Sequence, residues 1–153
     1  WCASQALEVN PDGALTAIRE GRLPDGDTFD PTTTALLDSG PLAAWKADAA
    51  TGSADATVDR TSQNRYVVHA RTPCLLVIGE VYYPWWRASI DDAPATLARV
   101  NYTMLGVSVP IGDHVVRLSM APESLWIGSA VSGLGVLLLA ALVLLNVIRR
   151  QAK

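Results

Sequence analysis

Residues 56–82 read ATVDRTSQNRYVVHARTPCLLVIGEVY, in which short runs of β-branched and apolar residues are separated by turn-forming pairs at 63–64 and 72–73. Runs of this length and composition are typical of β-strands. They predict strands at 56–61, 65–71 and 74–82. The third run is apolar on both faces over its first half, as expected of a central strand that is covered on both sides.

The same pattern continues downstream. It predicts four more strands, at 86–91, 95–100, 104–109 and 114–120. In the last of them, apolar side chains alternate with polar ones, which is the period of a strand with one buried face. Seven strands in about 65 residues leave no room for the crossovers that parallel strands need. We therefore expect a mostly β fold, an antiparallel and jelly-roll-like β-sandwich at 56–122.

The preceding residues 1–55 are expected to pack on this sandwich as a short helix, a short strand and an irregular segment. Asn10 supplies an N-cap, Pro11 suits the first helical position and Gly21 provides a stop, which predicts a helix at about 11–20. Thr34 to Leu37 is predicted to be a short strand, and residues 39–55 an irregular crossing segment.

An uncharged run of 24 residues, LWIGSAVSGLGVLLLAALVLLNVI at 125–148, follows the β region. As a helix of about 36 Å it would cross a bilayer with some tilt. Arg149, Arg150 and Lys153 lie in the tail 149–153 directly after it. By the positive-inside rule, the tail is expected to be cytoplasmic and residues 1–124 extracytoplasmic.

Four small residues lie in the first half of the predicted span: Gly128, Ser129, Ser132 and Gly133. They form two pairs spaced four apart, which lets another helix backbone approach closely. This spacing indicates packing against other transmembrane helices of a parent protein, or simply the high glycine content of membrane helices.

The residues before the span are acidic. Residues 1–124 carry nine of the twelve basic residues and all fifteen acidic ones, a net charge of −6. Without a Lys/Arg cluster they lack the charge that nucleic-acid binding requires, so we expect no nucleic-acid partner. The chain opens on Trp1, with no signal peptide before the β region, so we expect a fragment of a longer protein.

Two cysteines, Cys2 and Cys74, are compatible with one disulfide in an oxidising compartment. Two free buried thiols would fit the sequence as well.

Residues that could carry catalysis or hold a cofactor are few. His69 and His114 are the only histidines, and neither has cysteine or carboxylate partners at the spacing of a zinc site. Nucleotide-binding and serine-hydrolase motifs are also missing from the sequence. We expect no catalytic, cofactor-binding or metal-binding residue in this chain.

The distinctive local feature is a group of aromatic residues with an arginine. Its members are Tyr82, Tyr83, Trp85, Trp86, Arg87 and, from a later strand, Tyr102. If exposed, such rings could form a stacking platform for an envelope glycan, because sugars present apolar C–H faces. Alternatively, the rings close one end of the sandwich or lie against neighbouring membrane loops.

Several short motifs carry a family resemblance. They are LVIGEVYYPWW at 76–86, IDDAP at 90–94, VNY at 100–102, GVSVP at 106–110 and the spaced residues Gly112, His114 and Val116. With these motifs and the span that follows, the chain resembles the C-terminal end of the YfhO-like family of bacterial membrane proteins over about residues 56–135. Trp85 and Asp92 stand where that family usually has glycine, which bears on the local turn geometry.

The resemblance implies a polytopic protein of the bacterial cell membrane, similar to the GT-C glycosyltransferases. Such enzymes move a sugar from a polyprenyl-phosphate donor to a cell-envelope polymer. Their catalytic acid lies in an early outward loop, which would be upstream of Trp1, so the fragment itself is expected to be non-catalytic. The alternative is a single-pass, membrane-anchored module that binds a glycan or a protein and has no enzyme activity.

Overall fold

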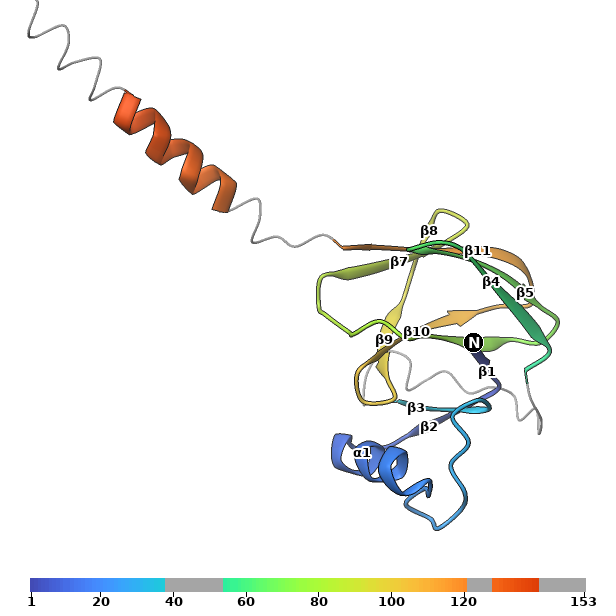
Figure 1. Cartoon of the computed structure of the whole chain (residues 1–153). Coiled ribbons are helices and arrows are strands. Elements are labelled where there is room, and N and C mark those ends of the chain that lie inside the picture. The colour runs from blue at the N-terminus through green and yellow to red at the C-terminus, as the bar shows by residue number, and fades with distance from the viewer. Residues whose placement is uncertain (38–53, 121–127, 141–153) are drawn as a thin grey trace, which may run out of the picture. The chain divides into compact units, whose positions relative to one another are not determined.

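The computed structural model describes residues 1–37, 54–120 and 128–140 (Figure 1). The chain divides into two compact units, 1–120 and 121–153, each of which is described by itself. The first unit is mostly β, and the described part of the second is a helix at 128–140. The expectation of a mostly β fold followed by a C-terminal helix is confirmed. Most of the predicted irregular segment 39–55 lies outside the described residues.

The first unit consists of two β-sheets. The six-stranded sheet has the order β1 (Cys2–Ala3), β6 (Cys74–Ile78), β10 (Met104–Val109), β9 (Leu97–Val100), β3 (Thr34–Leu37), β2 (Gln5–Glu8). The five-stranded sheet has the order β4 (Ala56–Ser62), β5 (Arg65–Ala70), β11 (Gly112–Met120), β7 (Trp86–Ile90), β8 (Ala93–Ala95). Among these strands, β2 and β3 pair in parallel, and the other pairs are antiparallel.

The main core lies between the two sheets and is built from alternate residues of their central strands. Its fully buried members include Val68, Leu76, Val107 and Val116. Leu75 and Val77 point to the other face of β6, where they belong to a second buried cluster. Because every residue of β6 is buried, the prediction of a central strand covered on both faces is confirmed.

Helix α1 (Pro11–Glu20) connects β2 to β3, as a parallel strand pair requires. The side chain of Asn10 accepts a hydrogen bond of 2.6 Å from the backbone N–H of Gly13, which caps the helix. Gly21 ends it with a left-handed φ of 67°. The predicted helix at 11–20 and the predicted strand at 34–37 are confirmed.

The N-terminal segment forms part of the sandwich itself. The sequence predicts instead that residues 1–55 pack on the sandwich from outside. Strands β1, β2 and β3 belong to the six-stranded sheet, so this sheet begins at Cys2 and not at residue 56. β1 and β2 have the sequences CA and QALE, without β-branched residues or alternation. β1 is a strand because it pairs with β6, and β2 because it pairs with β3. Pairing with a distant strand cannot be predicted from the local sequence.

Two other predicted strands differ more from the observed strands than the rest, whose ends agree within two residues. The strand predicted at 74–82 ends at Ile78, and the one predicted at 95–100 is divided between β8 and β9. The division falls at Thr96, where the chain passes from one sheet to the other. A change of sheet interrupts the pairing without interrupting the apolar pattern, so the sequence shows a single strand.

The β7–β8 hairpin closes through Asp91 and Asp92. Their φ angles are 49° and 69°, positive at both positions as a two-residue type I′ turn requires. Aspartate tolerates the left-handed region better than most residues. Asp92 therefore adopts the positive φ for which glycine is the usual residue at the second position of such a turn.

Gly106 on β10 has a different role, because it needs space and not a positive φ. A Cβ added to Gly106 would lie 2.5 Å from Cγ1 of Val100, a fully buried residue of β9. Because Gly106 has no side chain, the side chain of Val100 on β9 can lie directly against the backbone of β10.

The helix at 128–140 is uncharged, and its large side chains are exposed. Val131, Leu134, Val136, Leu137, Leu138 and Leu139 are 58–68% exposed. At about 100° per residue these six side chains point in all directions, so the helix has no polar face. Among the described residues, no helix is long and apolar enough to cross a membrane. The predicted span 125–148 extends beyond the described residues at both ends, and the tail 149–153 lies outside them.

Gly106→Ala is expected to lower the free energy of unfolding by about 1–3 kcal/mol, because the new methyl group overlaps Val100. Val100→Ala alone loses buried methyl groups and is also destabilising. The double variant should cost less than the sum, since removing Cγ1 makes room for the added methyl group. Urea unfolding of the four proteins measures this coupling, and strictly additive costs would contradict the steric explanation.

Candidate functional site

The aromatic loop, residues 79–85, leaves the end of β6 and returns into β7 at Trp86. Three hydrogen bonds fix it. The N–H of Tyr82 donates to the carbonyl of Thr103 at 2.7 Å, which ties the loop to the β9–β10 turn. The backbone N–H of Trp86 donates to Tyr83 at 3.1 Å, and its indole Nε1 donates to the carbonyl of Val81 at 3.1 Å. The loop therefore presents its side chains in a defined arrangement.

The structure divides the predicted aromatic group into inward and outward rings. Tyr82 and Trp86 are partly buried and pack against the main core. Tyr83, Trp85 and Tyr102 are exposed by 51%, 39% and 41% of their surface. Two rings thus pack on the main core and three lie on the surface, and glycan stacking by the exposed rings stays a prediction.

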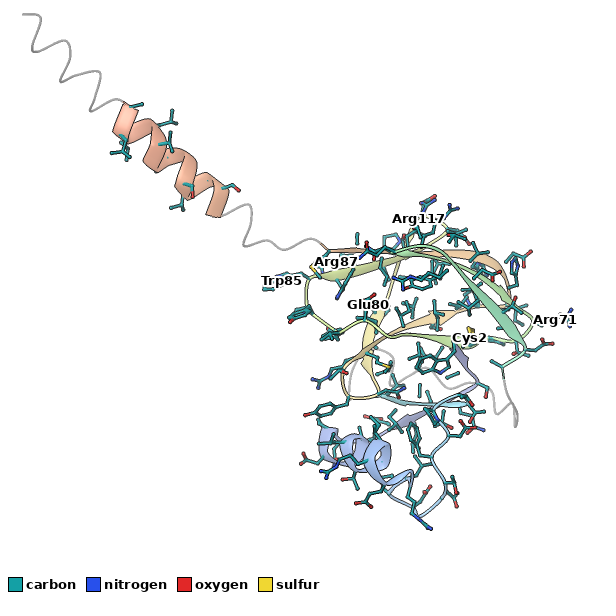
Figure 2. All side chains as sticks on the ribbon, in the orientation of Figure 1. Cys2, Arg71, Glu80, Trp85, Arg87 and Arg117 are labelled. Carbon is teal, nitrogen blue, oxygen red and sulfur yellow. A yellow bond between two sulfur atoms is a disulfide. The ribbon has the colours of Figure 1, made fainter. Side chains whose placement is uncertain are left out.

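Arg87 holds the loop from its C-terminal side. Its Nη1 donates to the carbonyls of Pro84 at 2.9 Å and Trp86 at 3.1 Å. Figure 2 shows Trp85 and Arg87 together, at the end of the sandwich where β11 finishes. There Met120, which is 49% exposed, is paired with Trp86 across the sheet.

A polar cleft lies at the other end of β11 and was not predicted from the sequence. It measures about 550 Å³ and is lined by Asp55, Thr57, His69, Ala70, Arg71, Gly112 and Asp113. His69 Nδ1 lies 2.8 Å from Asp113 Oδ1, and Arg71 lies 3.5 Å from Asp55. His69 and Asp113 face each other in the β5–β11 register, a pairing that becomes visible only when strand partners are known.

His114 and Asp91 form a second histidine–carboxylate pair, beside the β7–β8 turn. His114 Nδ1 lies 2.7 Å from Asp91 Oδ2, and its Nε2 lies 3.2 Å from the carbonyl of Ile111. Both ring nitrogens face acceptors, so the protonated imidazole satisfies both contacts. The bond to Asp91 therefore raises the pKa of His114. The N–H of Val115 and the His114 ring, which both donate to Asp91, lower the pKa of this carboxyl.

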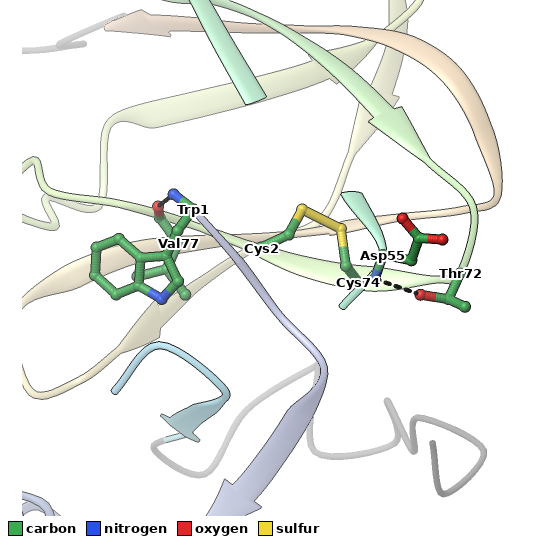
Figure 3. The surroundings of a disulfide bond; sticks show 6 residues. All are labelled: Trp1, Cys2, Asp55, Thr72, Cys74 and Val77. Atoms are coloured by element: carbon green, nitrogen blue, oxygen red, sulfur yellow. Dashed lines mark hydrogen bonds between the residues drawn. A yellow bond between two sulfur atoms is a disulfide. The ribbon is translucent and has the colours of Figure 1, made fainter. Parts of the chain in front are cut away.

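The two cysteines are joined as a disulfide between β1 and β6 (Figure 3). Their Cα atoms lie 5.4 Å apart, although the residues are separated by 72 positions in the sequence. Cys74 is fully buried and Cys2 is 8% exposed. The bond links the edge strand β1 of the six-stranded sheet to its neighbour β6.

The described residues offer little for metal chemistry or cofactor binding. Within 1–37, 54–120 and 128–140, no group of three or more His, Cys, Asp and Glu residues could hold a metal ion. Gly128, Ser129, Ser132 and Gly133 lie on the helix at 128–140, where a Cβ at either glycine would meet no atom within 4 Å. Their role in helix packing stays a prediction.

Comparisons with protein-family models, with curated proteins and with solved structures give no match to this chain. The likeness to the YfhO-like family therefore rests on the short motifs alone.

The stability of the chain is expected to fall as the pH rises through the pKa of His114. The hydrogen bond to Asp91 raises this pKa above the usual 6.5, so the contribution is complete below about pH 6.5 and lost above the folded-state pKa. Urea midpoints measured from pH 5.5 to 8.5 should show this slope in the parent and a weaker one in His114→Gln. An equal slope in both proteins would contradict this role of the histidine.

Reduction of the Cys2–Cys74 disulfide is expected to lower the free energy of unfolding by about 4 kcal/mol, because a long loop is no longer closed in the unfolded chain. Urea midpoints with and without reductant measure the effect. The double variant Cys2→Ala/Cys74→Ala is the control, since reductant should leave its midpoint unchanged. An unchanged parent midpoint, with both thiols shown to be free, would refute the stabilising role.

Proposed function

We propose that this chain is the outward-facing β-sandwich module of a bacterial membrane protein, anchored by residues 125–148. In this proposal it forms the non-catalytic C-terminal part of a YfhO-like, GT-C-type glycosyltransferase. The parent enzyme would move a sugar from a polyprenyl-phosphate donor to a cell-envelope polymer. The glycosyltransferase activity is supported by the sequence resemblance.

One observation supports membrane anchoring above all others: the helix at 128–140 exposes large aliphatic side chains on every side. Burying one such side chain is worth about 1.5–3 kcal/mol, so six of them left in water carry a large free-energy cost. A helix that is apolar all round is typical of a membrane span or a deeply buried core helix. The uncharged sequence continues to residue 148, which gives enough length for a bilayer.

The orientation is supported by two independent features. The Cys2–Cys74 disulfide is typical of compartments outside the cytoplasm, where thiols are oxidised. Arg149, Arg150 and Lys153, which follow the apolar run, favour a cytoplasmic C-terminus. Together these two features favour a location of residues 1–120 on the extracytoplasmic side of the membrane.

The non-catalytic character of the module is supported by how its polar side chains are engaged. The two histidines each contact one aspartate, and Arg117 of β11 contacts Asp92 in the β7–β8 turn. These contacts join neighbouring strands and turns of one sheet, as structural cross-strand pairs do.

The second candidate is a single-pass binding module for an envelope glycan. It is favoured by the exposed rings of Tyr83, Trp85 and Tyr102, which could stack on sugar faces. Titrating the membrane-reconstituted chain with envelope glycans while following tryptophan fluorescence separates the two. A saturable change that disappears in Trp85→Ala would favour the glycan-binding module.

The transferase activity is tested in membranes from cells that produce the full-length parent protein. We expect transfer of labelled sugar from polyprenyl-phosphate to polymer, and loss of this transfer when the parent gene is deleted. Equal transfer in both membranes would refute the glycosyltransferase assignment and leave anchoring intact.

Leu137→Arg/Leu138→Arg is expected to release the chain from membranes. Each arginine near the centre of a span costs about 2.5–3.5 kcal/mol of insertion free energy. The chain, synthesised in the presence of liposomes, should resist carbonate extraction, and the double variant should appear in the supernatant. Ile111→Arg is the matched control, because Ile111 is 62% exposed in the sandwich and its replacement should leave the anchor intact. Complete extraction of the parent chain would refute anchoring.

A further inference from the structure

We propose that one end of the sandwich rests on the lipid headgroups of the outer leaflet. The contact surface, called the aromatic edge, consists of Val81, Tyr83 and Trp85 of the aromatic loop and Met120 at the end of β11, all of which are exposed. The inference goes beyond anchoring, since it assigns a lipid contact to the β domain, but it rests on the proposed span.

The first argument is the length of the tether. β11 ends at Met120, and the apolar run begins at residue 125. From Met120 to residue 125 there are five residue steps, which span at most about 18 Å even fully extended. Once 125–148 is in the bilayer, the end of β11 is held close to its surface. Trp86 pairs with Met120, so the aromatic loop that precedes it is held close to the surface too.

The second argument is the chemistry of the exposed side chains. Tryptophan and tyrosine have an apolar body and a polar tip, and both are enriched where proteins meet lipid headgroups. Trp85 and Tyr83 fit this description, and Val81 adds a purely aliphatic side chain that is 58% exposed. Arg87 is exposed beside them and supplies a positive charge of the kind that phosphate groups attract.

The same side chains suit a glycan less well. A sugar site needs placed polar groups for the hydroxyls beside its stacking rings. Glu80, the carboxylate of this loop, lies 3.6 Å from Arg60 and is engaged there. The aliphatic side chains Val81 and Met120 offer a sugar no hydrogen bond, whereas both can enter the lipid interface.

The opposite end of the sandwich provides a contrast. It carries the polar cleft, with the Arg71–Asp55 and His69–Asp113 pairs. Figure 2 shows Arg71 at the end away from Trp85. The two ends of the sandwich thus differ in polarity. The apolar end is the one at which β11 finishes and the chain continues towards the predicted span.

Fluorescence quenching by lipid tests the proposal directly. The full chain is reconstituted into phosphatidylcholine/phosphatidylglycerol vesicles with either ordinary acyl chains or chains brominated close to the headgroup. The contribution of Trp85 is the difference between the parent and Trp85→Phe. We expect this contribution to be roughly twofold lower in the brominated lipid, because an interfacial indole lies near the bromine atoms.

The matched control moves the reporter to the other end of the sandwich. Ile111 is 62% exposed in the β10–β11 turn, nine residues from Met120, a distance of about 30 Å along a strand. Trp85→Phe/Ile111→Trp should therefore gain a tryptophan signal that brominated lipid does not quench. Equal quenching at both positions would indicate unspecific adsorption and overturn the proposal.

Carbonate extraction of the same vesicles distinguishes failure of the lipid contact from failure of membrane anchoring. A carbonate-resistant chain whose Trp85 signal is unaffected by bromine overturns the lipid contact and leaves the anchored module standing. A chain that carbonate removes completely overturns both. A Trp85 signal that responds to an envelope glycan but not to bromine overturns the lipid contact in favour of glycan binding.

Discussion

The burial of strand β6 on both faces is the constraint on which the other parts of the structure depend. Its alternate side chains need two covering layers, because Leu76 points into the core between the sheets while Leu75 and Val77 point the other way. The N-terminal segment contributes Ala3, Ala35 and Leu37 to the second of these buried clusters. β1 pairs with one edge of β6, and the Cys2–Cys74 disulfide makes that pairing covalent. Sheet order, disulfide and N-terminal strands are thus consequences of one strand.

The aromatic loop, which begins at the end of β6, is also linked to β3 through a chain of hydrogen bonds. The loop that leaves β6 is bonded to Thr103, next to the turn residue Asn101. Asn101 is 6% exposed and in turn joins β3: its N–H donates to the carbonyl of Leu36, and its Oδ1 accepts from the N–H of Leu36, both at 2.8 Å. Its φ of 47° is one that asparagine adopts more readily than most residues. The buried side chain of Asn101 thus ties the β9–β10 turn, to which the aromatic loop is bonded, to strand β3.

The sequence predicted those parts of the fold that local pattern determines. Alternation and turn residues located β4, β5, β7, β10 and β11, and capping residues located α1. It did not predict β1 and β2, whose conformation comes from distant partners, or the change of sheet at Thr96. The aromatic group was visible, but the division between partly buried Trp86 and exposed Trp85 was not, because the loop has no regular period. The polar cleft depends on strand register, which pairs His69 with a residue 44 positions away.

The net charge of the module limits which forces can hold the aromatic edge against a membrane. Residues 1–124 have a net charge of −6, so an anionic leaflet repels the module as a whole. Attraction of the kind that polybasic segments use is therefore excluded as the main force. Contact at the aromatic edge has to come from the tether, which keeps the domain close, and from the burial of rings and aliphatic groups. Since burial of apolar surface is not screened by salt, such a contact would persist at ionic strengths that dissociate peripheral proteins held by charge.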